Sequence, residues 1–487
     1  MSANLIKETR ELLLVVLGTL ALIIVPFLLN GADAAPFATV AFVLGAFVLG
    51  GCCFGNEFQH RTFPLLLSQP ISRSVLWREK MLALGAGIVT CLAALGLCRL
   101  IYGRGSEGEE PGIVVMIALC AFCGAPYFTL VCRHAIAGMA VATGFPVLLL
   151  LLGALLTGWW LKNEAVELTG AVMLVTLYCA AVLWSGHARF RALEVFDAAA
   201  PEISLPAGLE AALARPMARA SSRLRGAFGS LLRKEFRIQQ VSFLLAGALI
   251  LIAAAGCCVI PIYRELAVGI IAADYGTFML VLPLVAGAMA VAEERGWGLA
   301  EWHLTLPPSA RQQWSAKMLV TLPTSLGLGL LLPGGMFLVI RALLHVRGPG
   351  PDFPLGYGLA SLALGQLLVT SLAMYAGSCS RTTLRAILAV FGILITAYPV
   401  VSLAAIWGAR GTVPPALSAL LFRFLCPLDV QGIALFLMLC LVQWLAWSNF
   451  RRSGTPIRRL TGQFFGLLLA AGLVSAVIAH LAHPILR

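Results

Sequence analysis

Residues that could carry out catalysis are few in this 487-residue chain. A phosphate-binding loop for ATP ends in Gly-Lys-Ser/Thr, but none of the five lysines follows a glycine. The HExxH motif of zinc peptidases and the GxSxG nucleophile motif are also missing. We therefore expect the chain not to be an enzyme, not to hydrolyse ATP by itself, and to bind no cofactor or catalytic metal of its own.

Two short pairs do have metal or redox spacing. His480 and His483 lack the further ligands that a zinc site needs, so we interpret them as polar residues at a membrane boundary. Cys120 and Cys123 lie inside an uncharged stretch, where a thiol usually packs as a small hydrophobe.

The most informative polar residues lie in a segment that occurs twice. Residues Glu57–Leu82 and Glu294–Leu319 align at a constant offset of 237, with eight of 26 positions identical. The identical pairs are Glu57/Glu294, Leu67/Leu304, Pro70/Pro307, Ser72/Ser309, Trp77/Trp314, Lys80/Lys317, Met81/Met318 and Leu82/Leu319. Upstream, Lys7-Glu8-Thr9-Arg10 is echoed by Lys234-Glu235-Phe236-Arg237. A match of this extent predicts an internal repeat.

The elements that carry these segments are membrane helices. Hydrophobic residues make up 60% of the chain and charged residues 11%, against about 25% charged in soluble proteins. A membrane-spanning helix needs about 20 apolar residues, and we find thirteen stretches of 18 or more residues without Asp, Glu, Lys or Arg. They are 12–32, 34–56, 81–98, 111–132, 134–161, 168–188, 238–263, 275–292, 318–340, 353–380, 386–409, 430–450 and 460–486. The predicted fold is an all-α polytopic membrane protein with about 13 transmembrane helices.

The basic residues predict the orientation of these helices. Lys and Arg are retained on the cytoplasmic side, and an inside N-terminus places 25 of the 34 there. We therefore expect a multi-pass protein of the cytoplasmic (inner) membrane with its N-terminus in the cytoplasm and its C-terminus outside. The net charge of +12 is then explained by the basic cytoplasmic loops and their contact with anionic membrane lipids. We therefore expect no nucleic-acid partner.

The repeat divides the chain into two parallel-oriented six-helix repeats, a pseudo-dimer, plus one extra C-terminal span. An even number of spans gives both copies the same orientation. The expected parts are 1–190 with a cytoplasmic segment at 56–80, a connector at 187–232, 233–450 with a segment at 293–317, and a basic loop with the thirteenth span at 451–487.

Each cytoplasmic segment could form a docking surface. Ser72 is a good N-cap residue for a short amphipathic helix that carries Trp77 and lies on the membrane face. The alternative is an interfacial loop with Trp77 as an anchor and Lys80 extending to the headgroups. The occurrence of the whole arrangement in both halves favours docking.

Here a family resemblance becomes specific. The stretch from Glu57 to Arg73, with Trp77 and Lys80, resembles the signature cytoplasmic stretch of permease subunits in the type-2 class of ATP-binding-cassette (ABC) transporters. The resemblance implies amphipathic elbow helices at Lys7–Leu14 and Lys234–Val241. It also implies a coupling helix that docks on a cytoplasmic ABC ATPase, present in two copies, which binds ATP and Mg²⁺. The residues implied in coupling are Glu57, Arg61, Pro70, Ser72, Arg73, Trp77, Lys80, Glu294, Pro307, Ser309, Arg311, Trp314 and Lys317.

The expected function is export driven by that ATPase, and an amphiphilic or lipid-like cargo fits the apolar spans better than a small ion. One chain supplies both six-helix repeats, and a homodimer of the chain is an alternative assembly. A secondary transporter driven by ion gradients would need buried acids at mid-span, and Asp274 lies near an outer boundary. A membrane-embedded lipid-modifying enzyme would need a cluster of His, Asp or Glu at one membrane face, which the sequence does not show. A scaffold without transport activity is a further alternative.

Overall fold

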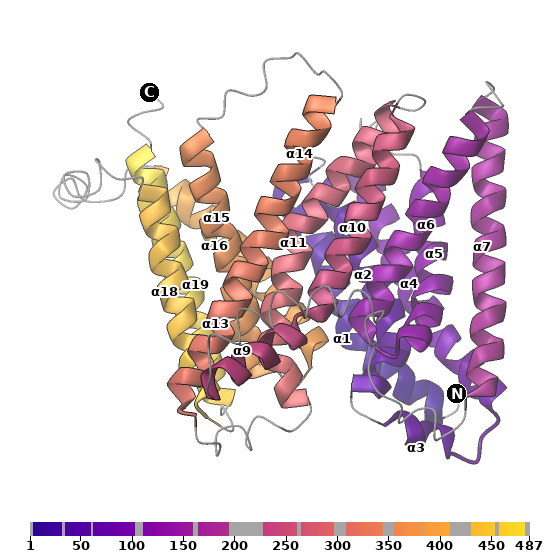
Figure 1. Ribbon diagram of the computed structural model, residues 1–487, viewed down its shortest axis with the longest axis horizontal. Coiled ribbons are helices and arrows are strands. Elements are labelled where there is room, and N and C mark those ends of the chain that lie inside the picture. Colours follow the sequence, from indigo (N-terminus) through magenta and orange to yellow (C-terminus); the bar gives the residue numbers. More distant parts are fainter. Residues whose placement is uncertain are drawn as a thin grey trace. The chain divides into compact units, whose positions relative to one another are not determined.

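The chain is helical throughout the part that the structure describes. The computed structural model describes residues 3–31, 35–59, 62–102, 111–158, 164–193, 227–260, 264–296, 308–343, 355–380, 382–409, 430–452 and 457–482. These ranges contain no strand, which confirms the all-α prediction. The helices in Figure 1 are α1 (Ala3–Asn30), α2 (Ala35–Gln59), α3 (Phe63–Leu67), α4 (Arg73–Tyr102), α5 (Pro111–Cys132), α6 (Ala135–Gly158), α7 (Glu164–Ala192), α9 (Ala227–Ile238), α10 (Gln240–Val259), α11 (Arg264–Gly296), α13 (Ala310–Leu326), the π-helical turn η3 (Gly327–Leu331), α14 (Leu332–Leu343), α15 (Leu355–Cys379), α16 (Thr383–Ala409), α18 (Val430–Phe450) and α19 (Ile457–Ala482).

Membrane spans account for most of these helices. Within the described ranges, 12 helices are long and apolar enough to cross a membrane. The remaining predicted stretch, 386–409, falls in α16, whose described apolar part is Thr383–Leu394. Helices are the expected solution because a spanning segment must satisfy its backbone hydrogen bonds internally. The prediction of a multi-pass membrane protein is confirmed.

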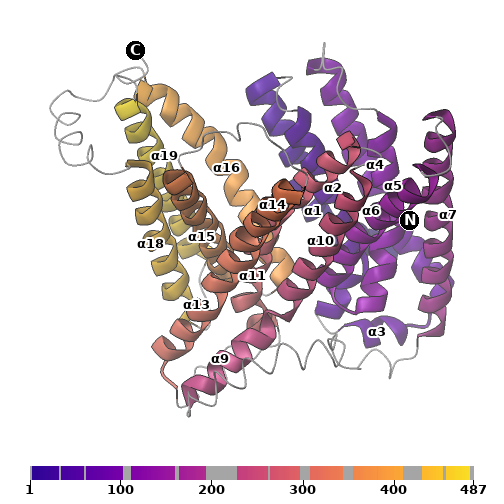
Figure 2. The same cartoon turned by 45° about the horizontal axis from the view of Figure 1, so that its top comes forward.

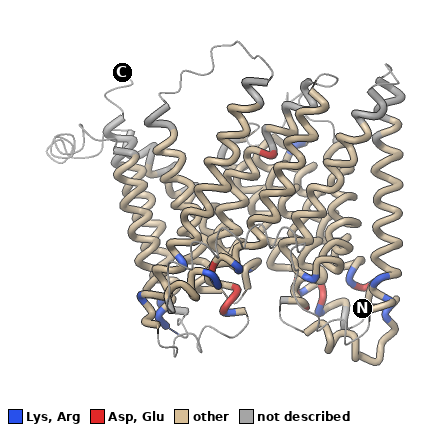
Figure 3. The backbone as a smooth tube through the Cα atoms, viewed as in Figure 1, with Lys and Arg blue, Asp and Glu red and all other residues tan. Residues whose placement is uncertain are grey.

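The chain forms two compact units. Unit 1 comprises Met1–Ala212 and Leu244–Asp274, and unit 2 comprises Leu213–Phe243 and Tyr275–Arg487. Helix α9 therefore belongs to unit 2, whereas α10 belongs to unit 1. Within each unit, most of the described charged residues gather near one end of the helices, as Figure 3 shows.

In unit 1, small residues let α2 approach its neighbours closely. A Cβ atom at Gly55 would lie 2.5 Å from the Cβ atom of Ala135 on α6, and Gly51 faces Met139 of the same helix. Helix α1 packs against α2 and α4, and α5 packs against α6 and α7 (Figure 2). Close approach through Gly and Ala is the usual way in which membrane helices gain packing energy.

Unit 2 uses small residues at the corresponding place. On α11, Ala288 and Ala292 are fully buried, and their backbone lies against Gly377 of α15. Helix α15 packs along α18, α16 packs along α19, and α9 contacts α13 (Figure 1).

The first of the two duplicated segments differs from the expected short amphipathic helix. Its short helix is α3, and α4 begins at Arg73 and continues for 30 residues through the span. Trp77 and Lys80 therefore lie in the first turns of a membrane helix. Extending an existing helix adds one hydrogen bond per residue, whereas ending it leaves carbonyl groups unpaired, and Arg73–Tyr102 contains no proline.

The two expected elbow helices also differ from each other. Lys7–Leu14 lies inside the continuous helix α1, so the first half has no separate elbow. In the second half, α9 ends at Ile238 and α10 starts at Gln240. At the break, the Gln239 side chain donates to the carbonyl oxygen of Ala286 at 3.0 Å.

Candidate functional site: two buried lysine clusters

Lys80, in the first turns of α4, lies in the protein interior with 1% of its surface exposed. Its Nζ donates to Glu8 Oε2 of α1 at 2.6 Å, to Glu57 Oε1 of α2, and to the carbonyl oxygen of Cys53 at 3.0 Å. These acceptors use all three N–H donors of the ammonium group. The Lys80 cluster, defined as Lys80, Glu8 and Glu57, thus joins three helices.

Lys317 occupies the same kind of position in unit 2 and is also 1% exposed. Its Nζ donates to Glu235 of α9 at 3.0 Å, to the carbonyl oxygen of Ala290 at 2.6 Å, and lies 2.8 Å from Glu294 Oε1 of α11. The Lys317 cluster, defined as Lys317, Glu235 and Glu294, joins α9, α11 and α13.

The two clusters correspond residue by residue. The two lysines, their acids at the ends of α2 and α11, and the carbonyl groups of Cys53 and Ala290 are all 237 positions apart. A buried ammonium group without partners would cost several kcal/mol. Both halves therefore stabilise their buried lysine in the same way, with two carboxylates and one backbone carbonyl group.

Lys7 precedes Glu8 on α1, and Lys234 precedes Glu235 on α9, but these two lysines make different contacts. Lys7 is half-exposed and lies 3.7 Å from Glu11 one turn along α1. In the echoed sequence Ile238 stands where Glu11 does, and Lys234 instead hydrogen-bonds to Glu294. The Lys317 cluster thus has a second cation in contact with it.

The electrostatic balance differs as a result. Glu57 Oε2 is buried and has no hydrogen-bond partner in the described part of the chain. In unit 2, burial raises the pKa of Glu235, and the nearby charges of Lys317 and Lys234 oppose that rise. Each cluster as defined has a formal charge of −1, and the difference lies in the added lysine: Lys234 hydrogen-bonds to Glu294, whereas Lys7 lies 4.0 Å from Glu8 and closer to Glu11.

Aromatic packing holds each lysine-bearing helix against the last span of its half. The Trp77 ring stacks on Phe54 of α2 with 5.4 Å between centroids, and its centroid lies 5.7 Å from that of Phe190 on α7. The Trp314 centroid lies 5.3 Å from that of Phe450 on α18. Both tryptophans are buried, so they contribute packing energy in the interior and do not act as interfacial anchors.

An arginine in each half contacts the end of the same last span. Arg73 donates to the carbonyl oxygen of Arg191 at 2.6 Å, in the last turn of α7. Arg295 of α11 donates to the carbonyl oxygen of Asn449 at 3.2 Å, near the end of α18. Positive side chains stabilise helix C-termini because the last carbonyl groups are unpaired there.

Helix α4 starts directly after Ser72, where the sequence predicts a helix start, and α13 starts directly after Ser309. Ser309 Oγ accepts from the backbone N–H of Gln312, and Gln312 Oε1 accepts from the backbone N–H of Ser309, which makes a capping box. Ser72 immediately precedes α4, and its carbonyl oxygen accepts from the N–H of Val75 at 2.9 Å.

The predicted coupling residues separate into a buried and an exposed group. The buried residues are Glu57, Trp77, Lys80, Glu294, Trp314 and Lys317. The exposed residues are Pro70, Ser72, Ser309 and Arg311, and Arg73 is half-buried. Arg61 and Pro307 lie outside the described residues. Arg78 of α4 is also exposed and lies beside this exposed group in the sequence.

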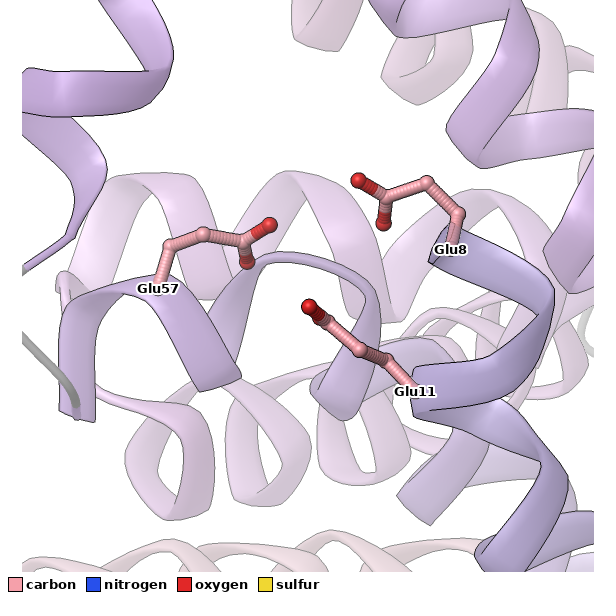
Figure 4. A group of neighbouring side chains, drawn as sticks. All are labelled: Glu8, Glu11 and Glu57. Atoms are coloured by element: carbon pink, nitrogen blue, oxygen red, sulfur yellow. The ribbon is translucent and has the colours of Figure 1, made fainter. Parts of the chain in front are cut away.

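Three glutamates converge at the Lys80 cluster. Oxygens of Glu8, Glu11 and Glu57 lie within 4.8 Å of one another, and Figure 4 shows their carboxylates turned toward a common point. The sequence pattern did not predict this grouping, because α1 and α2 meet only in the folded protein. Lys80 pairs with two of these carboxylates, and Lys7 lies 3.7 Å from the third.

Sequence reasoning missed two members of the clusters, Glu8 and Glu235. The signal was present in the echo of Lys7-Glu8-Thr9-Arg10 by Lys234-Glu235-Phe236-Arg237. This echo has an offset of 227 residues, so it was not aligned with the repeat at an offset of 237.

Comparison with known proteins adds no relative: no family model, no curated protein and no solved structure matches the chain.

Proposed function

We propose that the chain is the permease of an ABC export system, in which two six-helix repeats form a pseudo-dimer in the cytoplasmic (inner) membrane. The observation that carries this proposal is the pair of matched lysine clusters, each directly behind one copy of the duplicated coupling segment. A lysine buried with two acids is costly to maintain unless its partners are held in place. Its occurrence in both halves favours a shared mechanical task for the two segments.

In the proposed mechanism, ATP and Mg²⁺ bind to two copies of a cytoplasmic ATPase, which dock on the exposed residues of the segments. Pro70, Ser72 and Arg78 form the first contact, and Ser309 and Arg311 form the second. Because Lys80 is bonded to α1 and α2, a displacement of the start of α4 is transmitted to those helices. Rigid-body motion of packed helices is a common form of conformational change.

The asymmetry of the two clusters implies unequal docking sites. Arg73 has no matching arginine at the aligned position, since Ala310 stands there and Arg311 follows. The proposed N-terminus is cytoplasmic, the C-terminus is outside, and the proposed cargo is amphiphilic or lipid-like. One chain would carry both docking sites of a transporter.

The test is ATP hydrolysis by the purified complex in lipid vesicles. The tagged chain should co-purify with a soluble ATPase and stimulate its ATP hydrolysis. The double variant Arg78→Glu/Arg311→Glu should abolish both, because it reverses charge on the exposed docking face. Arg385→Glu, an exposed arginine on α16, is the matched control and should leave both intact. Full stimulation by the double variant would refute the docking assignment.

One observation favours a second candidate, a transporter driven by an ion gradient. Asp274 on α11 is 6% exposed, and its Oδ1 has no hydrogen-bond partner among the residues that the structure describes. Buried acids in membrane helices often mark ion or proton paths. If transport proceeds without ATP and Asp274→Asn abolishes it, the ion-gradient transporter replaces the ABC permease as the proposed function. If transport requires ATP and survives Asp274→Asn, the ABC permease proposal stands.

A further inference from the structure

The extra helix α19 builds a groove against α18. The groove has a volume of about 440 Å³ and is lined by three leucines, by Gly462 and Gly466, and by Arg459 and Gln463. Its lining is thus apolar except for one cationic and one amide side chain. Both helices lie in unit 2, and α19 otherwise packs along α16.

Polar contacts fix the two helices at one end of this groove. The Arg459 guanidinium donates to Ser448 Oγ of α18 at 2.6 Å. Asn449 and Gln463 exchange two hydrogen bonds at 2.9 and 3.0 Å. Because a guanidinium has five N–H donors, Arg459 can hold Ser448 and also donate to an anion.

The surroundings of Arg459 are strongly basic. Arg451 and Arg452 follow α18, Arg458 lies in the first turn of α19, and all three are exposed. Residues 430–487 contain no Asp or Glu. The Arg451 guanidinium lies over the Trp447 ring at 4.9 Å, and tryptophan is enriched at the level of lipid headgroups. The groove therefore combines an apolar floor with the cationic Arg459, and further exposed arginines lie close to it in the sequence.

We propose that this groove binds one anionic phospholipid, with its phosphate on Arg459 and an acyl chain along the leucines of α18 and α19. Charge complementarity selects the headgroup, since basic sites between membrane helices bind anionic lipids. The glycines keep the groove open: a Cβ atom at Gly462 or Gly466 would meet no atom within 4 Å. This site is independent of the transport function proposed above.

The test measures lipid retained by the full-length protein in detergent. Purified protein is delipidated, incubated with phosphatidylglycerol or phosphatidylcholine, and examined by native mass spectrometry. Two variants challenge the site: Arg459→Gln removes the charge, and Gly462→Leu fills the groove without changing charge. Arg385→Gln and Gly392→Leu on α16 are matched controls, because Arg385 is exposed and Gly392 also has open space around it.

We expect phosphatidylglycerol to bind in preference to phosphatidylcholine. One arginine near a membrane surface contributes about fivefold in affinity for anionic lipid, so Arg459→Gln should weaken binding by about that factor. Gly462→Leu should weaken binding of the same lipid, and the controls should not. Equal retention of both lipids, or unchanged binding in Gly462→Leu, would overturn the proposal. Displacement by millimolar inorganic phosphate would overturn the assignment of a lipid in favour of a phosphate site.

Discussion

Replacing Lys80 by methionine should severely destabilise unit 1. Methionine fills much of the volume of the lysine stem, so the substitution mainly removes the ammonium group. Glu8 and Glu57 are 6% and 3% exposed. They would then face each other without the ammonium group that joins them, with only the half-exposed Lys7 nearby, 4.0 Å from Glu8 Oε1. Glu57 Oε2 already lacks a partner in the wild type.

The expected loss follows from this burial. Removing one partner of a buried ion pair costs about 3–5 kcal/mol, because the remaining charge stays desolvated. Lys7→Met is the matched control in the same cluster of charges. Its side chain is 48% exposed and pairs with Glu11 at 3.7 Å, so its loss should cost at most about 1 kcal/mol.

Thermal unfolding in detergent, followed by size-exclusion fluorescence, measures both variants. A difference of about 3–4 kcal/mol corresponds to a midpoint roughly 10 °C lower for a unit of this size. The triple variant Lys80→Met/Glu8→Gln/Glu57→Gln should recover most of the loss, since a buried ion pair replaced as a whole is often neutral. If Lys80→Met unfolds at the temperature of Lys7→Met, Lys80 does not hold the three helices together.

Three further outcomes follow from the same contacts. Lys234→Met should lower the unfolding temperature more than Lys7→Met, because Lys234 is hydrogen-bonded to a buried acid; equal midpoints would contradict the asymmetry of the two clusters. Trp77→Ala should cost about 3–5 kcal/mol through the cavity left among its aromatic neighbours, measured by urea unfolding, and a loss below about 1 kcal/mol would show that the ring is not packed. Gly55→Leu should reduce the yield of folded protein, because its side chain would clash with α6. Gly18→Leu has open space and should fold normally, and equal yields would argue against the close approach of α2 and α6.

Hydropathy along the chain determines most of the fold. Each predicted uncharged stretch coincides with a helix, because the requirement for an apolar length and internal hydrogen bonds is local to each segment. Where each membrane helix begins is less predictable. The break at Gln239 coincides with a contact to α11, which no local pattern records, and the continuation of α4 from Arg73 through the span differs from the separate short helix that the sequence predicts after Ser72.

For the candidate site, the sequence alone identified the duplicated segments and both lysines, through identity at a fixed offset. It could not distinguish a lysine that reaches a partner from one that is buried, because both look the same within a charged segment. Only the tertiary structure decided that Lys80 and Lys317 lie inside, each held by acids from two other helices. The physical reason is that helix pairing brings together residues that are distant along the chain, and the spacing within one segment contains no information about the partner helix.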